Sequence, residues 1–273
     1  MQAREIRERL HSGQRVYGTM VVSESPLWPK AMASIGLDFV FIDTEHIAQD
    51  RNKLSWMCQL YAALDLAPIV RIPAPDPYLA AMMRDLGAQG VIAPYVESVE
   101  QVQELVGAVK YRPLKGGRLY AELRGEEKLE PELSEYLADR NDDGIVIVNI
   151  ESQPAMDILD DIASVDGVDA LLIGPHDLSC NLGIPEQYFH EKFVAAVDKI
   201  ITTGRAHGIG AGIHLVYPGA FEQEVRWSKM AANLVVHGID ITAMRAGLRA
   251  DFDALKAALD GEEDDASMDS INI

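Results

Sequence analysis

Five polar residues of this 273-residue sequence combine side-chain types that can bind and rearrange a small organic acid. Asp43, His46, Arg71, Glu151 and Asp177 each lie at or just beyond the end of a short apolar run. Two carboxylates can hold a hard divalent cation such as Mg²⁺ or Mn²⁺ and leave positions open for a ligand. A histidine can serve as a general acid or base near neutral pH, and an arginine can bind a carboxylate through two parallel hydrogen bonds. Together these types predict metal-assisted chemistry on an anionic carbonyl compound.

The same residues also have structural interpretations. Asp43 and Asp177 could cap helices, because a short carboxylate accepts hydrogen bonds from the first free N–H groups of a helix. Arg71 could form an ion pair with Asp43 or Glu45 that only stabilises the fold. The functional interpretation therefore depends on whether the fold brings these residues together.

Short β-type runs alternate with helix-length amphipathic stretches along most of the chain. Runs such as FVFID, GIVIVNI and ALLIG are almost entirely apolar, which is typical of parallel strands buried on both faces. We expect strands at residues 15–22, 38–43, 68–72, 90–93, 145–150, 170–173, 208–214 and 234–237. We expect the main helices at residues 25–35, 54–64, 77–86, 98–109, 154–163, 187–207, 220–231 and 250–259.

This alternation predicts an α/β fold of the (β/α)8 TIM-barrel type, with an open doubly wound sheet as the alternative. Chemistry in such barrels occurs at the carboxyl ends of the strands, so the polar residues above would share one rim with His214 and His237. We expect residues 1–260 to form a single domain that includes a long charged excursion at 112–142. The acidic residues 261–273 are expected to form a disordered tail.

The charge balance excludes several classes of partner. The chain has 24 Lys and Arg against 43 Asp and Glu, a formal net charge of −19, so we expect neither nucleic acid nor anionic membranes to bind.

No stretch approaches the roughly 20 apolar residues that span a bilayer, and the charged amino terminus lacks a signal-peptide core. Cys58 and Cys180 lie in unrelated segments without metal-ligand spacing. We therefore expect a cytoplasmic protein without a disulfide.

The lysine positions favour a metal-dependent route over a Schiff base. A Schiff-base enzyme of this fold needs a lysine inside the barrel mouth, but none of the nine lysines lies on an expected strand. The sequence also lacks a phosphate-binding loop, a GxGxxG motif and an HExxH motif.

Five segments together resemble the HpcH/HpaI aldolase family, the class II pyruvate aldolases. The resemblance runs from about residue 18 to the start of the last helix and implies a pyruvate-binding TIM barrel. It also implies a last helix exchanged between subunits, in a homo-oligomer that is a trimer or a hexamer. The segments are GLDFVFIDTEH (36–46), PIVRIP (68–73), RDLGAQGVIAPYVES (84–98), NIES (149–152) and VDGVDALLIGPHDLSCNLG (165–183).

The resemblance implies roles for the catalytic residues. His46 would be the general acid/base, and Asp85 would be its orienting partner across a subunit boundary. Arg71 would contact the substrate carboxylate and polarise the developing oxyanion. Asp43 belongs to the same block as His46 and would support His46 or Arg71.

The resemblance also implies the binding residues. Glu151 and Asp177 would hold the divalent metal ion, which would be Mg²⁺, Mn²⁺ or Co²⁺. Gly174 and Pro175 would shape the loop whose backbone meets the pyruvyl group.

Three positions depart from the family pattern. Asn149 stands where the aldolases usually carry Gln, which contacts the oxo acid. His176 stands where better-known members carry a small residue, and it could alter which aldehyde fits. The segment at 111–124 keeps Gly117 and Arg118 but lacks the usual arginine-rich continuation. Because of these departures, the resemblance does not identify the aldehyde that binds in the other half of the site.

The implied reaction is cleavage of a 4-hydroxy-2-oxo acid to pyruvate, or a related 2-oxo acid, and an aldehyde, through a metal-stabilised enolate. One alternative is a citrate-lyase-like enzyme that acts on a CoA thioester. It would need a basic site for the CoA phosphates, and the only candidate cluster is Arg112, Lys115 and Arg118. A second alternative is a non-catalytic barrel subunit, against which the intact set of site residues argues.

Overall fold

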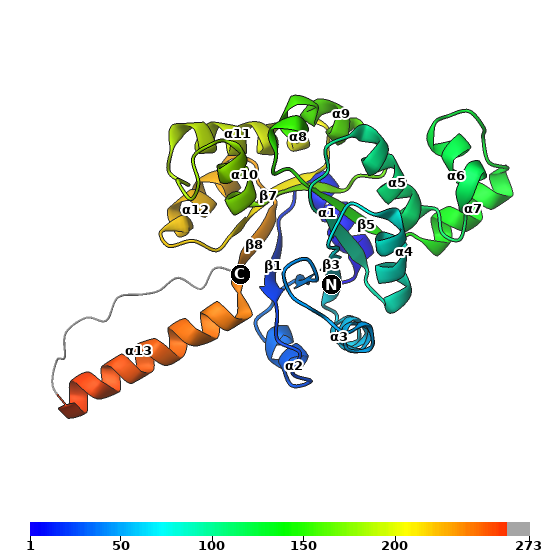
Figure 1. Ribbon diagram of the computed structural model, residues 1–273. Coiled ribbons are helices and arrows are strands. Elements are labelled where there is room, and N and C mark those ends of the chain that lie inside the picture. Colours follow the sequence, from blue (N-terminus) through cyan, green and yellow to red (C-terminus); the bar gives the residue numbers. More distant parts are fainter. Residues whose placement is uncertain (261–273) are drawn as a thin grey trace.

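Parallel strands form a closed barrel in the computed structural model, which describes residues 1–260, and this confirms the predicted (β/α)8 fold (Figure 1). Each strand pairs with its neighbours in the chain, and β8 pairs back with β1. The predicted strand ends agree with the observed ones to within two residues. The strands are β1 (Val16–Val21), β2 (Phe39–Asp43), β3 (Ala67–Arg71), β4 (Gly90–Ala93), β5 (Ile145–Asn149), β6 (Ala170–Ile173), β7 (Gly210–Leu215) and β8 (Leu234–Ile239). The predicted tail at 261–273 lies outside the described residues.

Alternate side chains of each strand pack into two separate apolar regions. On β2, Phe39 and Phe41 enter the barrel interior, whereas Val40 and Ile42 face the surrounding helices. Gly18 on β1 leaves room for the Phe39 ring, because a Cβ atom at this glycine would lie 2.4 Å from a ring carbon. Burial of each large apolar side chain contributes on the order of 2 kcal/mol to folding. The interior is therefore a packed core that supports the residues at its rim.

Helices surround the barrel in the expected alternation. α1 departs from it, because its buried apolar residues join the core of the barrel interior and Leu10 packs beside Gly210 at the amino end of β7. The helices are α1 (Ala3–Ser12), α2 (Trp28–Ala33), α3 (Arg51–Ala63), α4 (Pro77–Leu86), α5 (Val99–Lys110), α6 (Gly116–Leu123), α7 (Pro131–Arg140), α8 (Gln153–Asp157), α9 (Leu159–Ser164), α10 (Pro175–Asn181), α11 (Glu191–Ala206), α12 (Ala220–Met230) and α13 (Asp240–Asp260).

Two predicted helices differ from those observed. The helix expected at 154–163 is divided into α8 and α9 at Ile158, whose backbone (φ −114°, ψ 24°) lies outside the helical region. The helix expected at 187–207 begins only at Glu191, because Nδ1 of His190 accepts a hydrogen bond from the backbone N–H of Lys192 and caps the start of α11.

Besides α10, which follows β6 outside the expected helices, two segments contain more helix than the sequence pattern indicated. The charged excursion at 112–142 holds α6 and α7, and the second begins with Pro131, a favoured residue for the first turn. α13 begins at Asp240, ten residues before the expected start at 250. Gly247 lies inside this helix and disfavours helix by about 1 kcal/mol relative to alanine, which concealed the early start.

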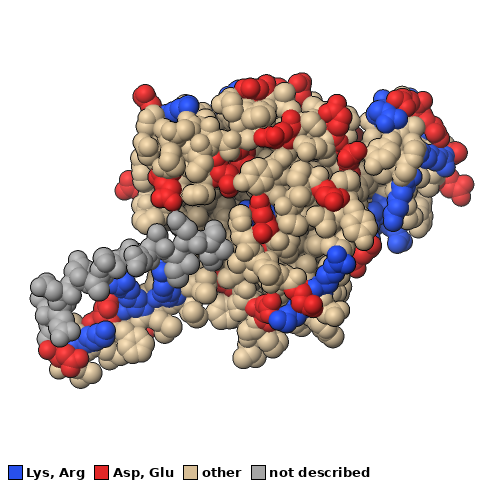
Figure 2. All heavy atoms as spheres, viewed as in Figure 1, with Lys and Arg blue, Asp and Glu red and all other residues tan. Residues whose placement is uncertain are grey.

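The surface carries charge of both signs in different places. On the face shown in Figure 2, Asp and Glu lie scattered across the barrel, whereas Lys and Arg gather mainly over the α6–α7 segment and along α13. No helix within residues 1–260 is long and apolar enough to cross a membrane.

Candidate active site

Four polar side chains enter the apolar barrel interior at the carboxyl ends of its strands. Asp43, Arg71 and Asn149 end β2, β3 and β5, and His214 lies one residue before the end of β7. All four are buried, with exposed fractions of 0 to 8%. Because side chains alternate along a strand, these positions continue the inward-facing rows of the barrel core. The fold therefore brings three of the predicted site residues to one rim, together with His214, which was expected there.

Two carboxylates hold Arg71 through a single nitrogen. Its Nε donates to Oδ1 of Asp43 at 2.7 Å and lies 3.1 Å from Oε2 of Glu45. The guanidinium carbon lies 5.1 Å from the centre of the Phe41 ring. Within residues 1–260 neither terminal nitrogen of Arg71 has a hydrogen-bond partner, and the side chain borders a cavity. These nitrogens can therefore bind a carboxylate in the fork geometry that suits arginine.

Asp43 pairs with Arg71 but caps no helix, because the N-cap of α3, the next helix, is Asp50. Burial opposes ionisation, but the hydrogen bond and charge of Arg71 bring the pKa of Asp43 below its ordinary value. The carboxylate also accepts the backbone N–H groups of Glu45 at 3.1 Å and His46 at 3.3 Å. Asp43 thus shapes the turn after β2 and orients Arg71.

His46 borders the same cavity as Arg71, in the loop between β2 and α3. Its side chain is 40% exposed, and its Nε2 lies 3.8 Å from Oε2 of Glu45. In the part of the chain that the structure describes, its ring nitrogens make no hydrogen bond. An accessible imidazole in this position can exchange a proton with a bound molecule.

Glu151 and Asp177 face a common space next to Gly174. Glu151 follows β5, and Asp177 lies in the first turn of α10, directly after β6. A Cβ atom at Gly174 would lie 2.4 Å from Oε2 of Glu151 and 3.6 Å from Oδ2 of Asp177, so these two oxygens are at most about 6 Å apart. A side chain at position 174 would fill the space between the carboxylates, which glycine leaves open.

Tyr95 contacts both of these carboxylates, and sequence reasoning missed it. Its backbone N–H donates to Oε1 of Glu151 at 2.8 Å, and its hydroxyl donates to Oδ1 of Asp177 at 2.8 Å. Its φ of 48° lies in the left-handed region, which non-glycine residues rarely adopt. Its position two residues after β4 is the sequence feature that points to it, because residues just beyond a barrel strand lie at the rim.

The residues present fit a divalent cation. Burial raises the pKa of Glu151 to about 7, the hydrogen bond from Tyr95 opposes this, and the charges of Asp177 and Glu45 raise it further. A cation would offset this crowding of negative charge, and carboxylate oxygens suit Mg²⁺ or Mn²⁺. Among residues 1–260, no three His, Cys, Asp or Glu side chains form a group that could hold an ion. Glu151 and Asp177 would therefore leave several coordination positions to water and substrate.

A cavity of about 70 Å³ lies between these groups. Asn149 donates from Nδ2 to Oε2 of Glu151 at 3.1 Å, and its buried Oδ1 has no donor among the described residues. At the mouth, His176 is 58% exposed, with Nδ1 3.8 Å from Oε1 of Glu186 and Nε2 4.0 Å from Sγ of Cys180. The predicted site residues that line the cavity are His46, Arg71, Asn149, Gly174, Pro175, His176 and Asp177.

Neither Asp85, the implied partner of His46, nor His237, which was expected at the rim, lines this cavity in the described chain. Asp85 is near the end of α4, which leads into the amino end of β4, and its exposed carboxylate pairs with Arg112. Within one chain Asp85 and His46 therefore lie at opposite ends of the barrel, so their predicted interaction requires a second subunit and stays a prediction. His237 faces away from the barrel interior, with 64% of its side chain exposed, and pairs with Glu224 at 2.7 Å.

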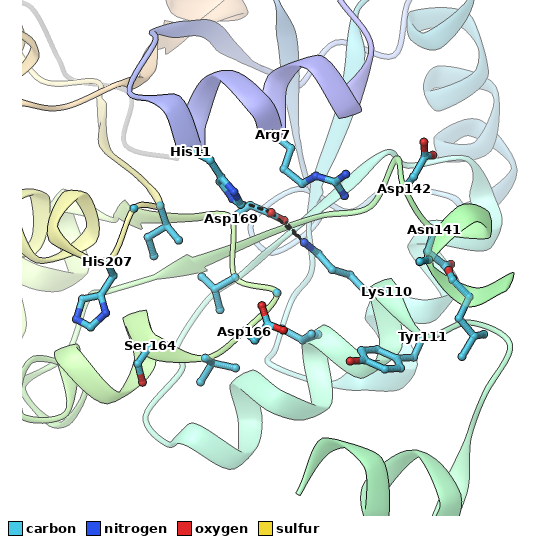
Figure 3. Close-up of a pocket in the computed structure, with 18 of the residues that line it drawn as sticks. Arg7, His11, Lys110, Tyr111, Asn141, Asp142, Ser164, Asp166, Asp169 and His207 are labelled. Carbon is cyan, nitrogen blue, oxygen red and sulfur yellow. Dashed lines mark hydrogen bonds and ion pairs between the residues drawn. The ribbon is translucent and has the colours of Figure 1, made fainter. Parts of the chain in front are cut away.

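A second cavity, of about 670 Å³, lies away from this site, at the amino ends of the strands (Figure 3). Figure 3 shows His11 and Lys110 converging on Asp169, the residue before β6. Asp169 is fully buried and accepts hydrogen bonds from Lys110 at 2.9 Å and from the N–H of Val146 at 2.8 Å. Its charge is thus compensated within the fold, and barrels carry out chemistry at the opposite end, so we assign this cavity a structural role.

The fold and site define a (β/α)8-barrel protein with carboxylates and an arginine at its mouth. The chain belongs to the HpcH/HpaI aldolase/citrate lyase family, whose model matches residues 17–246. This confirms the resemblance inferred from the sequence motifs.

Individual relatives agree with this assignment. The 2-keto-3-deoxy-L-rhamnonate aldolase of Escherichia coli (strain K12) is 31% identical over 234 residues, which cover 86% of each chain. An HpcH/HpaI aldolase from Desulfitobacterium hafniense DCB-2 has a similar structure, with a TM-score of 0.78, 26% identity, and coverage of 94% of this chain and 99% of that one. The citrate synthase SbnG also has a TM-score of 0.78, with 30% identity and coverage of 93% and 98%.

Proposed function

We propose that this protein is a divalent-metal-dependent aldolase that cleaves a 4-hydroxy-2-oxo acid to pyruvate, or a related 2-oxo acid, and an aldehyde. The observation that carries the proposal is the arrangement around one cavity. Arg71, with two free terminal nitrogens, lines this cavity together with His46 and Asp177. The buried carboxylate of Glu151 lies next to Gly174 and Asn149, which also line it. This is the set of groups that binding and cleaving a 2-oxo acid requires.

Each residue has a role that follows from its contacts. Arg71 binds the substrate carboxylate, because Asp43 and Glu45 occupy only its Nε and leave both terminal nitrogens available. His46 takes the proton of the C4 hydroxyl during cleavage and returns it in the reverse reaction. Asn149 lines the cavity beside Glu151 and donates from Nδ2 to Oε2 of that carboxylate.

Glu151 and Asp177 would hold the metal ion, with Tyr95 fixing the position of both carboxylates. When bound, the ion would polarise the 2-oxo group and stabilise the negative charge that develops there. The metal could be Mg²⁺, Mn²⁺ or Co²⁺.

The relatives support this reaction class. The Escherichia coli relative is named for cleavage of a 2-keto-3-deoxy sugar acid, which is a 4-hydroxy-2-oxo acid in chemical terms. The CoA-thioester alternative has less support, because Arg112 pairs with Asp85 and Arg118 pairs with Glu127 and Glu130. Two of the three cations in the candidate cluster for CoA phosphates are therefore neutralised by neighbouring carboxylates.

We also propose that the functional protein is a homo-oligomer in which α13 is exchanged between subunits. α13 extends away from its own barrel (Figure 1), and beyond Asp240 none of its residues is buried. One stripe of the helix is nevertheless apolar, with spacings of three and four residues that place its members on one face. The stripe consists of Ile241, Met244, Leu248, Phe252, Leu255 and Leu259.

The barrel has a matching gap in its outer layer of helices. Outward-facing Tyr17 and Thr19 of β1 and Val235 and His237 of β8 are partly or fully exposed, with Tyr17 at 47%, whereas β2 to β7 are buried throughout. In a complete (β/α)8 barrel, a helix covers this face of each strand. The last helix of a second subunit would fill the gap, and the same assembly could bring Asp85 of the partner subunit to His46.

Release of pyruvate from synthetic 4-hydroxy-2-oxo acids, coupled to lactate dehydrogenase, tests the proposed reaction. We expect release that stops after chelation and resumes when Mg²⁺, Mn²⁺ or Co²⁺ is added. An Arg71→Lys variant should raise KM at least tenfold, because an ammonium cannot form the paired hydrogen bonds of a guanidinium. The absence of pyruvate from every such acid, with folded protein and all three ions, would contradict the proposal.

A further inference from the structure

His214 is a buried titratable residue that the proposed reaction does not use. It lies on β7, is only 8% exposed, and lines the same cavity as Arg71 and His46. Its ring packs edge-on against Phe41, with the ring centres 5.4 Å apart, and Arg71 lies over that same phenylalanine ring. His214 is therefore close to the predicted substrate position.

The hydrogen bond that His214 makes determines which nitrogen carries its proton. Nε2 lies 3.1 Å from the carbonyl oxygen of Gly238, and a carbonyl can only accept, so Nε2 is the donor. Burial lowers the pKa of His214 to about 4, so the ring is neutral near pH 7. In this tautomer Nδ1 carries a lone pair and acts only as an acceptor.

Nothing in the described chain satisfies this acceptor. Within residues 1–260 Nδ1 of His214 has no hydrogen-bond partner. It is not one of the fully buried polar atoms, so a bound molecule can reach it. The cavity walls that accompany His214 are mostly apolar and include Met20, Leu172, Val216 and Ile239. An accessible acceptor in an apolar wall requires a donor from the bound molecule.

The register of the barrel places His214 beside the predicted metal site. Ile173 on β6 pairs with Ile213 on β7, so the next residues, Gly174 and His214, lie level on neighbouring strands. A substrate held next to Gly174 can therefore reach His214 with its more distant atoms.

The chemistry of the substrate identifies the donor. The pyruvate half of a 4-hydroxy-2-oxo acid offers only a carboxylate and a keto oxygen, which are both acceptors. The C4 hydroxyl is the group that exchanges its proton with His46 in the proposed reaction. We propose that Nδ1 of His214 accepts a hydrogen bond from the hydroxyl on the next carbon, so the enzyme prefers 2-hydroxyaldehydes over deoxy aldehydes. This inference rests on the proposed function and makes the natural substrate a 3-deoxy-2-oxo sugar acid.

The test compares two aldehydes with the wild-type full-length protein. The kcat/KM for aldol addition of pyruvate to glycolaldehyde is divided by the value for acetaldehyde, with Mn²⁺ present. We expect a ratio of about 10 or more, because a deoxy aldehyde leaves the acceptor of His214 without a partner. The ratio is taken within one protein, so the fraction of active enzyme cancels.

Two variants separate the acceptor from the rest of the ring. In His214→Gln the side-chain amide superposes on Nε2 and can keep the bond to Gly238, but the acceptor at the Nδ1 position is lost. In His214→Asn the amide superposes on Nδ1 instead. We expect the ratio to fall close to 1 in the glutamine variant and to stay well above 1 in the asparagine variant.

The outcomes distinguish this inference from the proposed function. A wild-type ratio near 1 overturns the inference even if neither variant folds, and so does an unchanged ratio in His214→Gln. Absence of product with both aldehydes, from folded wild-type protein with metal, contradicts the proposed aldolase function and removes the inference with it.

Discussion

Asp43 and Arg71 lie directly opposite each other in the register of β2 and β3, and their ion pair uses Nε of the arginine at 2.7 Å. Because Asp43 binds Nε, it fixes the plane of the guanidinium group and leaves the two terminal nitrogens of Arg71 available. Both side chains are buried, so the pair belongs to the core as well as to the site. Its geometry explains how an acidic protein presents one arginine to an anionic substrate.

Asp43→Asn should destabilise the protein, because it leaves the buried charge of Arg71 with a weaker partner. We expect the free energy of unfolding near pH 7 to fall by about 3 kcal/mol, measured by urea denaturation.

The pKa of Asp43 in the folded protein is below its ordinary value of 3.8. The ionised form therefore stabilises the fold above about pH 4, and this contribution is lost as the pH falls through the lowered pKa. The difference between wild type and variant should shrink below about pH 4; a difference that stays constant down to pH 3 would contradict this account.

Tyr95→Phe should weaken metal binding without unfolding the protein. The variant loses the hydroxyl that donates to Asp177 but keeps the backbone N–H that donates to Glu151. Loss of a group that orients a metal ligand commonly costs about 10-fold to 100-fold in affinity. Calorimetric titration with Mn²⁺ measures the change, and Tyr78→Phe is a control because Tyr78 is 69% exposed on α4. Equal affinity in wild type and Tyr95→Phe would remove Tyr95 from the metal site.

Gly174→Ala should displace Glu151, because the added methyl group would lie 2.4 Å from its Oε2. We expect Mn²⁺ affinity to fall by at least 10-fold, since Glu151 is one of only two predicted protein ligands. Gly117→Ala provides the control, because a Cβ atom at Gly117 meets nothing within 4 Å. If both variants bind Mn²⁺ like the wild type, the space beside Gly174 is not the metal site.

Leu255→Asp should disrupt the proposed oligomer. Leu255 belongs to the apolar stripe of α13 and is 53% exposed in the single chain. A charge at this position cannot be buried against a second subunit without a large cost in free energy. Sedimentation equilibrium should show a smaller species for Leu255→Asp, whereas Lys256→Gln, which changes the net charge equally, should keep the wild-type assembly. A wild-type monomer would refute helix exchange.

Much of the fold could be predicted because the strands are short, nearly continuous apolar runs. FVFID at β2 and ALLI at β6 have the length and composition of buried strands, and their regular alternation with helices favours a barrel over an open sheet. α13 was harder, because its apolar face is not buried against its own chain and it contains Gly247. The apolar stripe of such a helix does not reveal where the helix packs.

The candidate site was predictable where polar residues end apolar strands, as at Asp43, Arg71 and Asn149. Tyr95 was not, because its role depends on a left-handed backbone that turns its N–H toward Glu151 and its hydroxyl toward Asp177. The acceptor on His214 was also hidden, since only the contact with the Gly238 carbonyl reveals its tautomer. Sequence spacing places such residues on the rim but does not show which atoms they present.

The most direct test of the central claim is exchange of the pyruvate methyl protons in deuterated buffer, followed by proton NMR after the metal is chelated. The exchange reports removal of a proton next to the keto group and needs no knowledge of the aldehyde. The account predicts exchange by the wild type with Mg²⁺ or Mn²⁺, none in metal-free protein, and a loss of at least 100-fold in Asp177→Asn, which lacks one of the two predicted metal ligands. Exchange that is independent of metal, or no exchange by folded protein with either ion, would contradict it.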